Sequence, residues 1–415
     1  MVERTDVVVV GAGLAGLSAA WRLRQAGLDV VVCESADEVG GRVRTDVVDG
    51  FRLDRGFQVL LPSYPAVKAL PGLASLRLQP FARGVVAAGA DGRTELVPRR
   101  SALGDVARFA VQHTRDVLSL AAFSARDIAA PAKAIRSKPR RTTAAELSEV
   151  GLSPGLVDSV FRPFLAGVFL DRDLGTSSRV FHLIWRSFLR GGGALPASGM
   201  GALPHLLASF LRPGTVRCNT HVSAVTEHGV RLRTRHAIHA RAVVVATDGT
   251  AAAQLLPGVT APEWHSVVTY YYRLPAPPPD TGSTLLVDGE LLLNTAVISN
   301  VAPGHAPPGR ALVAASIPEP SDDPDLEGVV RERLSTLYGT DTSGWDLLRT
   351  YEIPQALPVM GPQHPLRQPV RIADGRYVCG DHRDTSSIQG ALVSGRRAAA
   401  AVIQDLAARG QAARG

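Results

Sequence analysis

Three glycines and one acid near the N-terminus have the types and spacing that a dinucleotide-binding site needs. Gly11, Gly13 and Gly16 form a GxGxxG pattern, and Glu34 follows the next apolar run. In such a pattern the first glycine permits a tight turn, the second lets the backbone approach a pyrophosphate, and the third allows close helix packing. The alternative is a glycine-rich turn that binds nothing.

The flanking segments have the order that this chemistry requires. Residues 6–10 are an apolar run of strand length, residues 17–27 have helical spacing, and residues 28–33 form a second apolar run. The free N–H groups and positive dipole end of the helix would face the phosphates. Glu34, at the tip of the second strand, would accept hydrogen bonds from an adenosine ribose and repel a 2′-phosphate, so NADP is not expected. The predicted cofactor contacts are Gly11, Gly13, Leu14, Ala15, Gly16, Glu34 and Ser35.

The segment after the acid, residues 39–45 (VGGRVRT), would reach the pyrophosphate from a second side. Gly40 and Gly41 offer backbone groups there, and Arg42 and Arg44 offer guanidinium groups. An exposed basic loop is the alternative. From this point the chain resembles the flavin-containing amine oxidase and phytoene desaturase superfamily, in which a GGR element follows the ribose-binding Glu and contacts FAD. The resemblance implies FAD, and no residue suggests a covalent link, so noncovalent binding is expected.

The C-terminal region matches the same superfamily independently. Residues 376–381 predict a short strand ending in Gly-Asp, and residues 385–398 predict a turn into a helix with an xxGAxxSG pattern. The resemblance implies that Asp381 binds the ribityl–phosphate region and that the helix start lies by the flavin N1–O2 edge, where its dipole would stabilise negative charge. A Gly/Ala-rich helix without a ligand is the alternative. The predicted contacts here are Gly380, Asp381, Ser387, Ile388, Gln389 and Ala391.

Three further blocks agree in their order along the chain. Residues 50–58 resemble the GxxxDxG segment that approaches the flavin ring, and residues 196–204 resemble a PxGGMxxLP turn. Residues 222–225 and 242–247 resemble the strands that hold the adenine and close the FAD sheet. The contacts that these blocks add are Gly56, Phe57, Gln58, Val222, Ala246 and Thr247.

These motifs lie far apart in sequence, which predicts an α/β fold with an inserted domain. We expect a Rossmann-type FAD-binding domain made of residues 1–64, 196–254 and 346–415, and a two-piece α+β substrate domain made of residues 65–195 and 255–345. Strands are expected at 266–274, 283–287 and 311–317. Val106, Phe109, Val117, Leu120 and Ala121 have helical spacing. This stretch predicts either an ordinary amphipathic helix or a helix that contacts a membrane surface.

Composition excludes several other classes of protein. The net charge is +7, but no aromatic–basic interleaving or nucleic-acid fold is evident, so nucleic acid is not an expected partner. Cys33, Cys218 and Cys379 form no CxxC pair, which predicts neither a disulfide framework nor a zinc site and favours the cytoplasm. The scattered histidines do not predict a metal site. The first apolar run leads into a glycine turn rather than a cleavage site, and no apolar stretch has the length of a membrane span.

The expected chemistry is hydride transfer from an organic substrate to flavin N5. There is no second GxGxxG unit of comparable quality and no CxxxxC pair, so electrons should leave to oxygen, a quinone or another acceptor. Flavin amine oxidases usually carry a tyrosine before the xGA helix and a lysine near N5. Here Ile388 takes the place of the tyrosine, and residues 264–273 contain no lysine. These departures favour a desaturase-like dehydrogenation of a small or lipophilic substrate over an amine oxidase proper.

Candidate catalytic residues are Gln58, His382 and Tyr271. Gln58 could meet the substrate side of the flavin, and His382 could transfer protons near the ring, or belong to a polar loop that only positions FAD. Tyr271 could line the pocket or pack in the core. Two further alternatives stay open: a non-redox isomerase or cyclase that uses FAD as a scaffold, and a non-catalytic flavin-binding protein. The sequence identifies neither the substrate nor the electron acceptor nor the oligomeric state.

Overall fold

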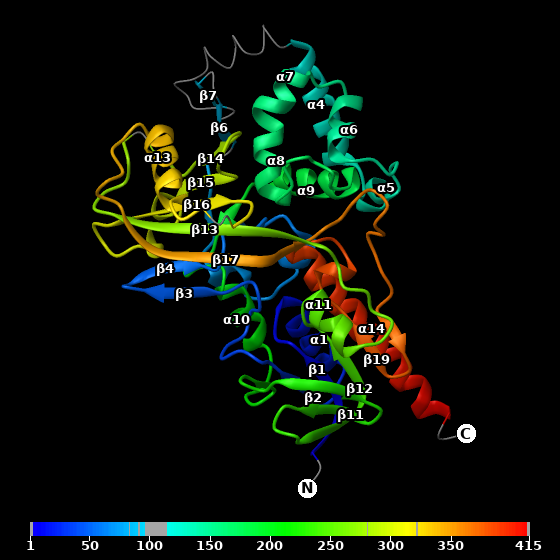
Figure 1. Ribbon diagram of the computed structural model, residues 1–415. Helices are drawn as coiled ribbons and strands as arrows, with labels where there is room; N and C mark the ends of the chain where they lie inside the picture. Colours follow the sequence, from blue (N-terminus) through cyan, green and yellow to red (C-terminus); the bar gives the residue numbers. More distant parts are fainter. Residues whose placement is uncertain are drawn as a thin grey trace.

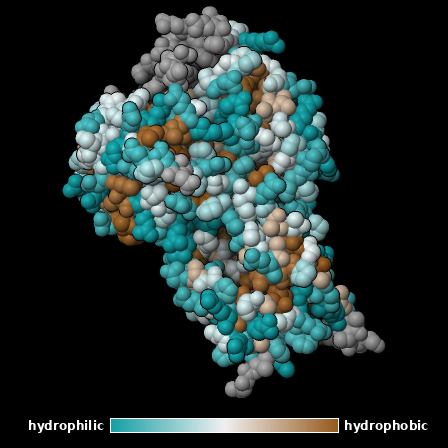
Figure 2. All heavy atoms as spheres, viewed as in Figure 1, coloured by the Kyte–Doolittle hydropathy of each residue, from teal (hydrophilic) through white to brown (hydrophobic). Residues whose placement is uncertain are grey.

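The computed structural model describes residues 3–82, 84–89, 92–95, 114–279, 281–320 and 323–412. In this part of the chain two large sheets organise the molecule into two units, and both termini lie at the far end of the first unit (Figure 1). The surface view in Figure 2 shows a largely hydrophilic face on which hydrophobic residues form several separate small areas. No described helix is long and apolar enough to cross a membrane, and no described group of His, Cys, Asp and Glu could hold a metal ion.

The first sheet is the expected Rossmann-type sheet. Its central strand β1 pairs in parallel with β2 on one side and with β12 on the other, so that Val8 lies between Val31 and Val243. These strands read as continuous apolar runs because both faces of a parallel sheet are covered. The sheet contains β10 (Val222–Thr226), β11 (Gly229–Leu232), β12 (Ala237–Val245), β1 (Glu3–Val10), β2 (Val30–Cys33) and β9 (Val216–Arg217), with β19 (Arg376–Val378) on β12 and β18 (Arg371–Ala373) on β19.

Two helices from opposite ends of the sequence pack together beside this sheet: α1 (Leu14–Gln25) and α14 (Ile388–Ala412) (Figure 1). Their backbones approach closely, since a Cβ atom on Gly395 would lie 2.1 Å from the carbonyl oxygen of Ala15. The Ser18 hydroxyl donates to the Leu392 carbonyl at 3.0 Å. This packing brings the N-terminal and C-terminal sequence motifs to one place. The smaller helices of the unit are α2 (Pro65–Lys68), α10 (Ala202–Ser209) and α11 (Gly249–Leu255).

The second sheet carries the strands expected for the substrate domain. Its order is β17 (Asp346–Pro358), β13 (Trp264–Leu274), β16 (Ala311–Ile317), β15 (Asn294–Val297), β14 (Leu285–Asp288), β6 (Val85–Gly89) and β7 (Gly92–Glu95). The sequence analysis assigned residues 346–415 to the FAD-binding domain, and the first part of this range lies elsewhere. Strand β17 pairs with β13 from Asp346 to Pro358, so its hydrogen bonds place residues 346–358 in the second sheet. Helices α12 (Ile298–Val301) and α13 (Leu326–Tyr338) complete this part.

A lobe of helices lies beside the second sheet (Figure 1). It comprises α4 (Thr114–Ala129), α5 (Ala132–Arg136), α6 (Thr143–Glu149), α7 (Pro154–Leu156), a π-helical turn (Val157–Phe161), α8 (Arg162–Phe169) and α9 (Ser178–Gly191). Val117, Leu120 and Ala121 of the predicted amphipathic helix lie in α4, whereas Val106 and Phe109 lie outside the described residues. The membrane-surface interpretation of that helix therefore stays untested.

A buried charged network joins the helices of this lobe. His182 on α9 is fully buried, and its Nδ1 lies 2.5 Å from the Asp127 carboxylate of α4. Its Nε2 lies 2.9 Å from Glu146 Oε1 of α6 and 2.8 Å from Lys138 Nζ. We call Asp127, Lys138, Glu146 and His182 the helical-lobe tetrad. Because one Nε2 atom cannot both donate to Glu146 and accept from Lys138, the proton on His182 decides which of them is its partner.

Short elements connect the two units. A hairpin of β3 (Thr45–Val48) and β4 (Phe51–Asp54) ends at Asp54, which accepts hydrogen bonds from Thr45 Oγ1 at 2.5 Å and from the Met200 amide at 2.8 Å. The 50–58 block and the 196–204 block therefore meet at one buried carboxylate. The other short elements are β5 (Gln79–Pro80), β8 (Ala194–Leu195) and the 3₁₀ turns Leu73–Leu76, Pro303–His305 and Asp381–Arg383.

Candidate active site

The glycine turn has the geometry that its spacing predicts. Gly11 has φ +101°, and its amide donates to the Cys33 carbonyl at 2.8 Å. A Cβ atom on Gly16 would lie 2.0 Å from the Gly11 carbonyl oxygen, so only glycine allows this helix-to-turn contact. A Cβ atom on Gly13 would meet nothing closer than 3.9 Å. Gly13 is therefore free of steric demand from the protein, as expected of a backbone that a pyrophosphate approaches.

The N-terminus of α1 is prepared for an anion. Gly13 occupies the N-cap position, so no side chain caps the helix, and the first turn holds no acidic residue. The amides of Ala15 and Gly16 therefore keep their hydrogen-bonding capacity, and the helix dipole adds partial positive charge. The next loop lies against this turn, since the Gly40 amide donates to the Ala12 carbonyl at 2.9 Å.

Glu34 is held rigidly at the tip of β2. Its Oε2 accepts from the Ala12 amide at 2.7 Å, and its Oε1 accepts from the Ala36 amide at 2.9 Å and from Ser35 Oγ at 3.3 Å. The residue is buried. Each carboxylate oxygen can accept more than one hydrogen bond, so Glu34 retains acceptor capacity for ribose hydroxyls while the backbone fixes its orientation.

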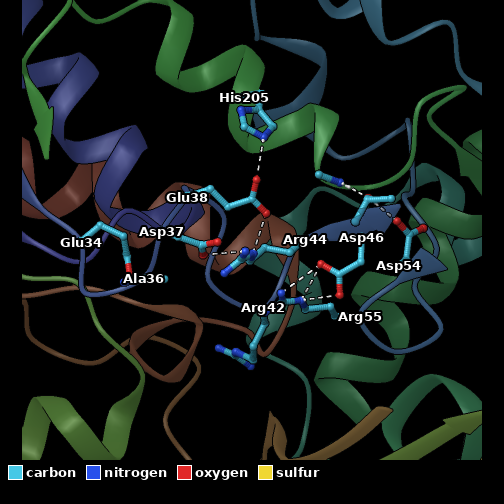
Figure 3. Close-up of polar contacts among 12 residues, drawn as sticks. Glu34, Ala36, Asp37, Glu38, Arg42, Arg44, Asp46, Asp54, Arg55 and His205 are labelled. Atoms are coloured by element: carbon cyan, nitrogen blue, oxygen red, sulfur yellow. Dashed lines mark hydrogen bonds and ion pairs between the residues drawn. The ribbon is translucent and has the colours of Figure 1, made fainter. Parts of the chain in front are cut away.

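The two arginines of the VGGRVRT segment have different partners. Arg42 Nη2 lies 2.6 Å from Asp381 Oδ1, and Arg42 Nη1 donates to the Ala356 carbonyl at 2.7 Å. Arg42 therefore joins the two predicted FAD motifs directly. Arg44 instead contacts two acids of its own loop, Asp37 at 2.9 Å and Glu38 at 2.7 Å, as Figure 3 shows. The contacts of Arg44 favour a role in shaping the loop, whereas the partly exposed Arg42 remains the better pyrophosphate candidate.

The C-terminal motif ends at the start of α14 (Ile388–Ala412). Buried Asp381 accepts from Arg42 and from the His382 amide at 3.1 Å. Ser387 Oγ caps α14 by accepting from the Gly390 amide at 3.1 Å, and Gln389 Oε1 accepts from the Ala66 amide at 2.9 Å. The side chains of Ser387 and Gln389 thus serve the fold. Any flavin contact from these two residues would involve the backbone or the helix dipole.

The remaining predicted FAD contacts lie around the same sheet edge and loops. Val222 begins β10, next to Thr220, whose amide donates to the Glu34 carbonyl at 2.7 Å. The Ala246 amide donates to the Val10 carbonyl at 2.8 Å, so Ala246 and Thr247 follow β12 at the level of the glycine turn. The Phe57 amide donates to Thr269 Oγ1 at 3.2 Å, beside Gly56. Individual FAD contacts of these residues stay predictions.

These features together fit FAD. An uncapped helix start, a glycine without steric neighbours, a fixed buried acid and a guanidinium group that reaches Asp381 are the donors and acceptors that a dinucleotide needs. Gly11, Gly13, Glu34 and Arg42 would hold the adenosine and pyrophosphate side. Asp381 and the start of α14 would hold the ribityl and flavin side.

The three candidate catalytic residues have unequal surroundings. Tyr271 is buried and its hydroxyl donates to the Asp54 carbonyl at 2.9 Å, which favours the packing interpretation. Gln58 Nε2 donates to the carbonyls of Arg42 at 2.8 Å and Arg55 at 3.0 Å, which favours a positioning role. Their catalytic roles stay predictions.

His382 differs because its imidazole is buried and neither ring nitrogen has a partner among the described residues. Burial lowers the pKa of His382 to about 4, so the ring is neutral near pH 7 and is only a weak base there. It stays a candidate because, of the three residues, it alone has buried polar side-chain atoms without a partner in the described structure.

A small apolar cluster next to these loops escaped the sequence analysis. Ala166, Val267 and Leu293 form its buried part, and Leu170, Ile353 and Ala356 pack against it. It adjoins the turn that is predicted to approach the flavin, since a Cβ atom on Gly56 would lie 2.8 Å from Ile353 Cδ1. Its members come from α8, β13, β17 and a loop. No local pattern could have identified them, because only the tertiary fold brings these segments together.

Comparisons with known proteins agree with this geometry. A family model described as flavin containing amine oxidoreductase matches residues 14–403. The chain belongs to this family. The predicted family, the Rossmann-type α/β fold, noncovalent FAD and the oxidoreductase class are thereby confirmed.

Relatives within the family act on different molecules. The putrescine oxidase of Kocuria rosea is 51% identical over 69 residues, which are 17% of this chain and 14% of that protein. The carotenoid 3,4-desaturase of Haloarcula japonica is 53% identical over 51 residues, 12% of this chain and 10% of that protein. The chain thus matches only a small part of the length of these curated relatives. The solved cyclohexylamine oxidase of Brevibacterium oxydans IH-35A has the same fold, with a TM-score of 0.67 and 18% identity over 97% of this chain and 99% of that chain.

Proposed function

We propose that this protein is an FAD-dependent dehydrogenase or desaturase that oxidises a lipophilic organic substrate. The observation that carries the proposal is the apolar cluster of Ala166, Val267 and Leu293 beside the flavin-approaching turn. The side chains of this cluster are buried against one another in this structure, and their apolar character suits contact with a hydrocarbon-rich substrate, because burying apolar area stabilises binding without a polar partner. The expected cytoplasmic location stays a prediction that goes with this proposal.

Two sequence departures support the same substrate class. Ile388, at the first position of α14, supplies an aliphatic side chain where amine oxidases place a tyrosine. The three lysines of the chain, Lys68, Lys133 and Lys138, all precede β13, so the strand that would carry the lysine near N5 has none. Both departures remove features that serve an amine substrate and leave an apolar wall.

Membership of the family suggests which steps FAD would perform and which the protein side chains would perform. Bound FAD would supply a two-electron centre that accepts a hydride. The chain would orient the substrate carbon and exclude water through the apolar cluster, and the α14 helix start would stabilise negative charge by its dipole. The substrate also loses a proton, and His382, whose ring nitrogens have no partner among the described residues, is the candidate of the C-terminal motif for this transfer. Reoxidation requires an acceptor such as oxygen or a quinone.

Amine oxidation is the second candidate function, because the family description and the putrescine oxidase relative both favour it. Hydride transfer from a neutral amine needs no protein base, so the missing lysine does not by itself exclude this reaction. The two candidates differ in the substrate that reduces the flavin, and the same experiment therefore separates them.

The test is anaerobic titration of the FAD-loaded protein with three panels: linear polyenes in detergent, cyclic lipophilic alcohols and short amines including putrescine. We expect the flavin absorbance to bleach with a member of the first or second panel. Bleaching by amines alone would establish the amine oxidase instead. Product formation without any bleaching or acceptor would favour the isomerase alternative. A variant with Leu293→Ala should lower lipophilic turnover while keeping its FAD, since it removes apolar area from the cluster without burying a charge.

A further inference from the structure

The turn of residues 54–57, which is predicted to approach the flavin, is held by side chains of the second sheet. Strand β13 makes one contact at each end of this turn. The Tyr271 hydroxyl donates to the Asp54 carbonyl at 2.9 Å, and the Phe57 amide donates to Thr269 Oγ1 at 3.2 Å. Thr269 and Tyr271 are two positions apart on one strand, so their side chains leave the same face of the sheet. One strand of the second sheet therefore holds both ends of the 54–57 turn.

The contact with Thr269 is the main anchor of the backbone in this turn. Among the amides of residues 56–59, only the Phe57 amide donates a hydrogen bond in the described part of the chain. The amides on either side, those of Arg55 and Leu60, are bonded to backbone carbonyls. Between these two points the amides of the segment are fixed by one side-chain hydroxyl, that of Thr269.

The Thr269 hydroxyl is itself oriented by a second hydroxyl. Thr269 is fully buried, and its Oγ1 lies 3.0 Å from the Oγ of buried Ser316, its register partner on β16. Because Thr269 Oγ1 accepts from the Phe57 amide, its own proton can be donated to Ser316, and the buried hydroxyl then has both of its partners. A valine would have the same shape. The hydrogen bonds to Phe57 and Ser316 are therefore what a threonine adds at this position.

We propose that Thr269 is a positioning residue for bound FAD: its hydroxyl, oriented by Ser316, fixes the Phe57 main chain in the turn that is predicted to approach the flavin ring. Part of the FAD site then depends on a side chain of the second sheet rather than on the Rossmann-type unit. The proposal rests on the FAD-dependent function and on the predicted place of the 54–57 turn. It does not depend on which substrate the flavin oxidises.

The first test is hydrogen–deuterium exchange of the apoprotein. Thr269→Val keeps the shape of the side chain and removes the acceptor, so the Phe57 amide should exchange at least about tenfold faster. Thr269→Ser keeps the hydroxyl and should stay within about threefold of the parent protein. The matched control is Thr295→Val, on a fully buried threonine of β15 whose hydroxyl contacts the Ala314 carbonyl at 2.8 Å and the Tyr338 hydroxyl at 3.0 Å. It should leave exchange at Phe57 unchanged.

The second test measures FAD affinity by flavin fluorescence and records the visible spectrum of the bound flavin. Thr269→Val should bind FAD about fivefold more weakly, because the turn occupies its binding-competent position for a smaller fraction of the time. Its bound flavin should also have an altered spectrum. Thr269→Ser and Thr295→Val should keep the parent affinity within about twofold and the parent spectrum.

Three results would overturn the proposal. Unchanged exchange at Phe57 in Thr269→Val would show that the hydroxyl does not hold the turn. Faster exchange with parent-like FAD affinity and spectrum would show that Thr269 holds the turn without positioning the flavin. An equal loss of affinity in Thr295→Val would assign the effect to general loosening of the second sheet. Neither test uses a substrate, so a failure of the lipophilic-substrate proposal would leave these results unaffected.

Discussion

The first unit and the helical lobe are held together by different kinds of contact. Around the glycine turn, backbone atoms touch each other: Gly16 against Gly11, and Gly395 against Ala15. In the helical lobe, side chains of the tetrad make the central polar contacts, with His182 between Asp127 and Glu146. Backbone contact tolerates almost no change in side-chain size, whereas a charged network depends on protonation. The two regions should therefore respond differently to substitution and to pH.

Gly16→Ala tests the backbone side of this comparison and should have the largest effect. The new Cβ atom would lie 2.0 Å from the Gly11 carbonyl oxygen, which is backbone and has little room to move. We expect the free energy of unfolding to fall by on the order of 3 kcal/mol or more, together with loss of bound FAD. Thermal unfolding and flavin absorbance measure both quantities.

The control is Gly155→Ala on α7 in the helical lobe, where a Cβ atom would meet nothing within 4 Å. It should change the free energy of unfolding by less than about 1 kcal/mol and leave FAD content unchanged. Equal losses in the two variants would mean that close backbone contact does not distinguish the first unit.

His182→Leu tests the charged side of the comparison. The change leaves Asp127 and Glu146 without their shared donor in a buried place, and we expect a loss of about 2–3 kcal/mol in the free energy of unfolding. His205→Leu, on a histidine whose side chain is 58% exposed and 3.7 Å from Glu38, is the matched control and should cost under about 0.5 kcal/mol (Figure 3).

The same network gives the protein a pH dependence of known sign. Burial would lower the pKa of His182, but hydrogen bonds to Asp127 and Glu146 raise it above its ordinary value. The stability from charged His182 is therefore fully present below its unfolded pKa of about 6.5 and is lost as pH rises through the folded pKa. Chemical denaturation between about pH 6 and pH 9 should show this decline in the parent protein. A decline of the same size in His182→Leu would show that another group causes it.

The sequence predicts the first unit well because the residue types that its close contacts require stand near one another in the chain. The Gly11 carbonyl lies so close to residue 16 that only glycine fits there, and the predicted ribose acceptor at the tip of β2 calls for an acid at residue 34. The position of strand β17 was harder to predict. It pairs with β13, which is far away in sequence, and no local pattern in either segment indicates which strand lies beside it. The tetrad and the apolar cluster were missed for the same reason. Asp127, Glu146 and His182 have no meaningful spacing in the sequence and become one site only when three helices pack.

Glu34→Gln tests a side-chain contact within the first unit, and we expect it to have a smaller effect than the changes above. The amide keeps an acceptor for the Ala12 or Ala36 amide but loses the charge that strengthens hydrogen bonds to ribose hydroxyls. We expect FAD affinity, measured by flavin fluorescence in titrations of the apoprotein, to fall about tenfold, or ~1.4 kcal/mol. Asp29→Asn, which alters an exposed carboxylate just before the start of the same strand, should have no effect on FAD affinity. If Glu34→Gln binds FAD as tightly as the parent protein, the proposal that Glu34 binds the ribose is wrong.

Trp264→Leu should have the smallest effect and tests how the second sheet supports the FAD site. The Arg42 guanidinium lies 5.4 Å from the centre of the Trp264 ring, on β13, so a residue of the second sheet orients a residue of the first unit. Loss of this cation–π contact should weaken FAD binding about threefold, or ~0.7 kcal/mol. A double-mutant cycle with Arg42→Met separates positioning from general packing. If Trp264 acts through Arg42, Trp264→Leu should no longer change FAD affinity once Arg42 is replaced. An undiminished effect in that background would mean that Trp264 influences FAD binding by a route other than its contact with Arg42.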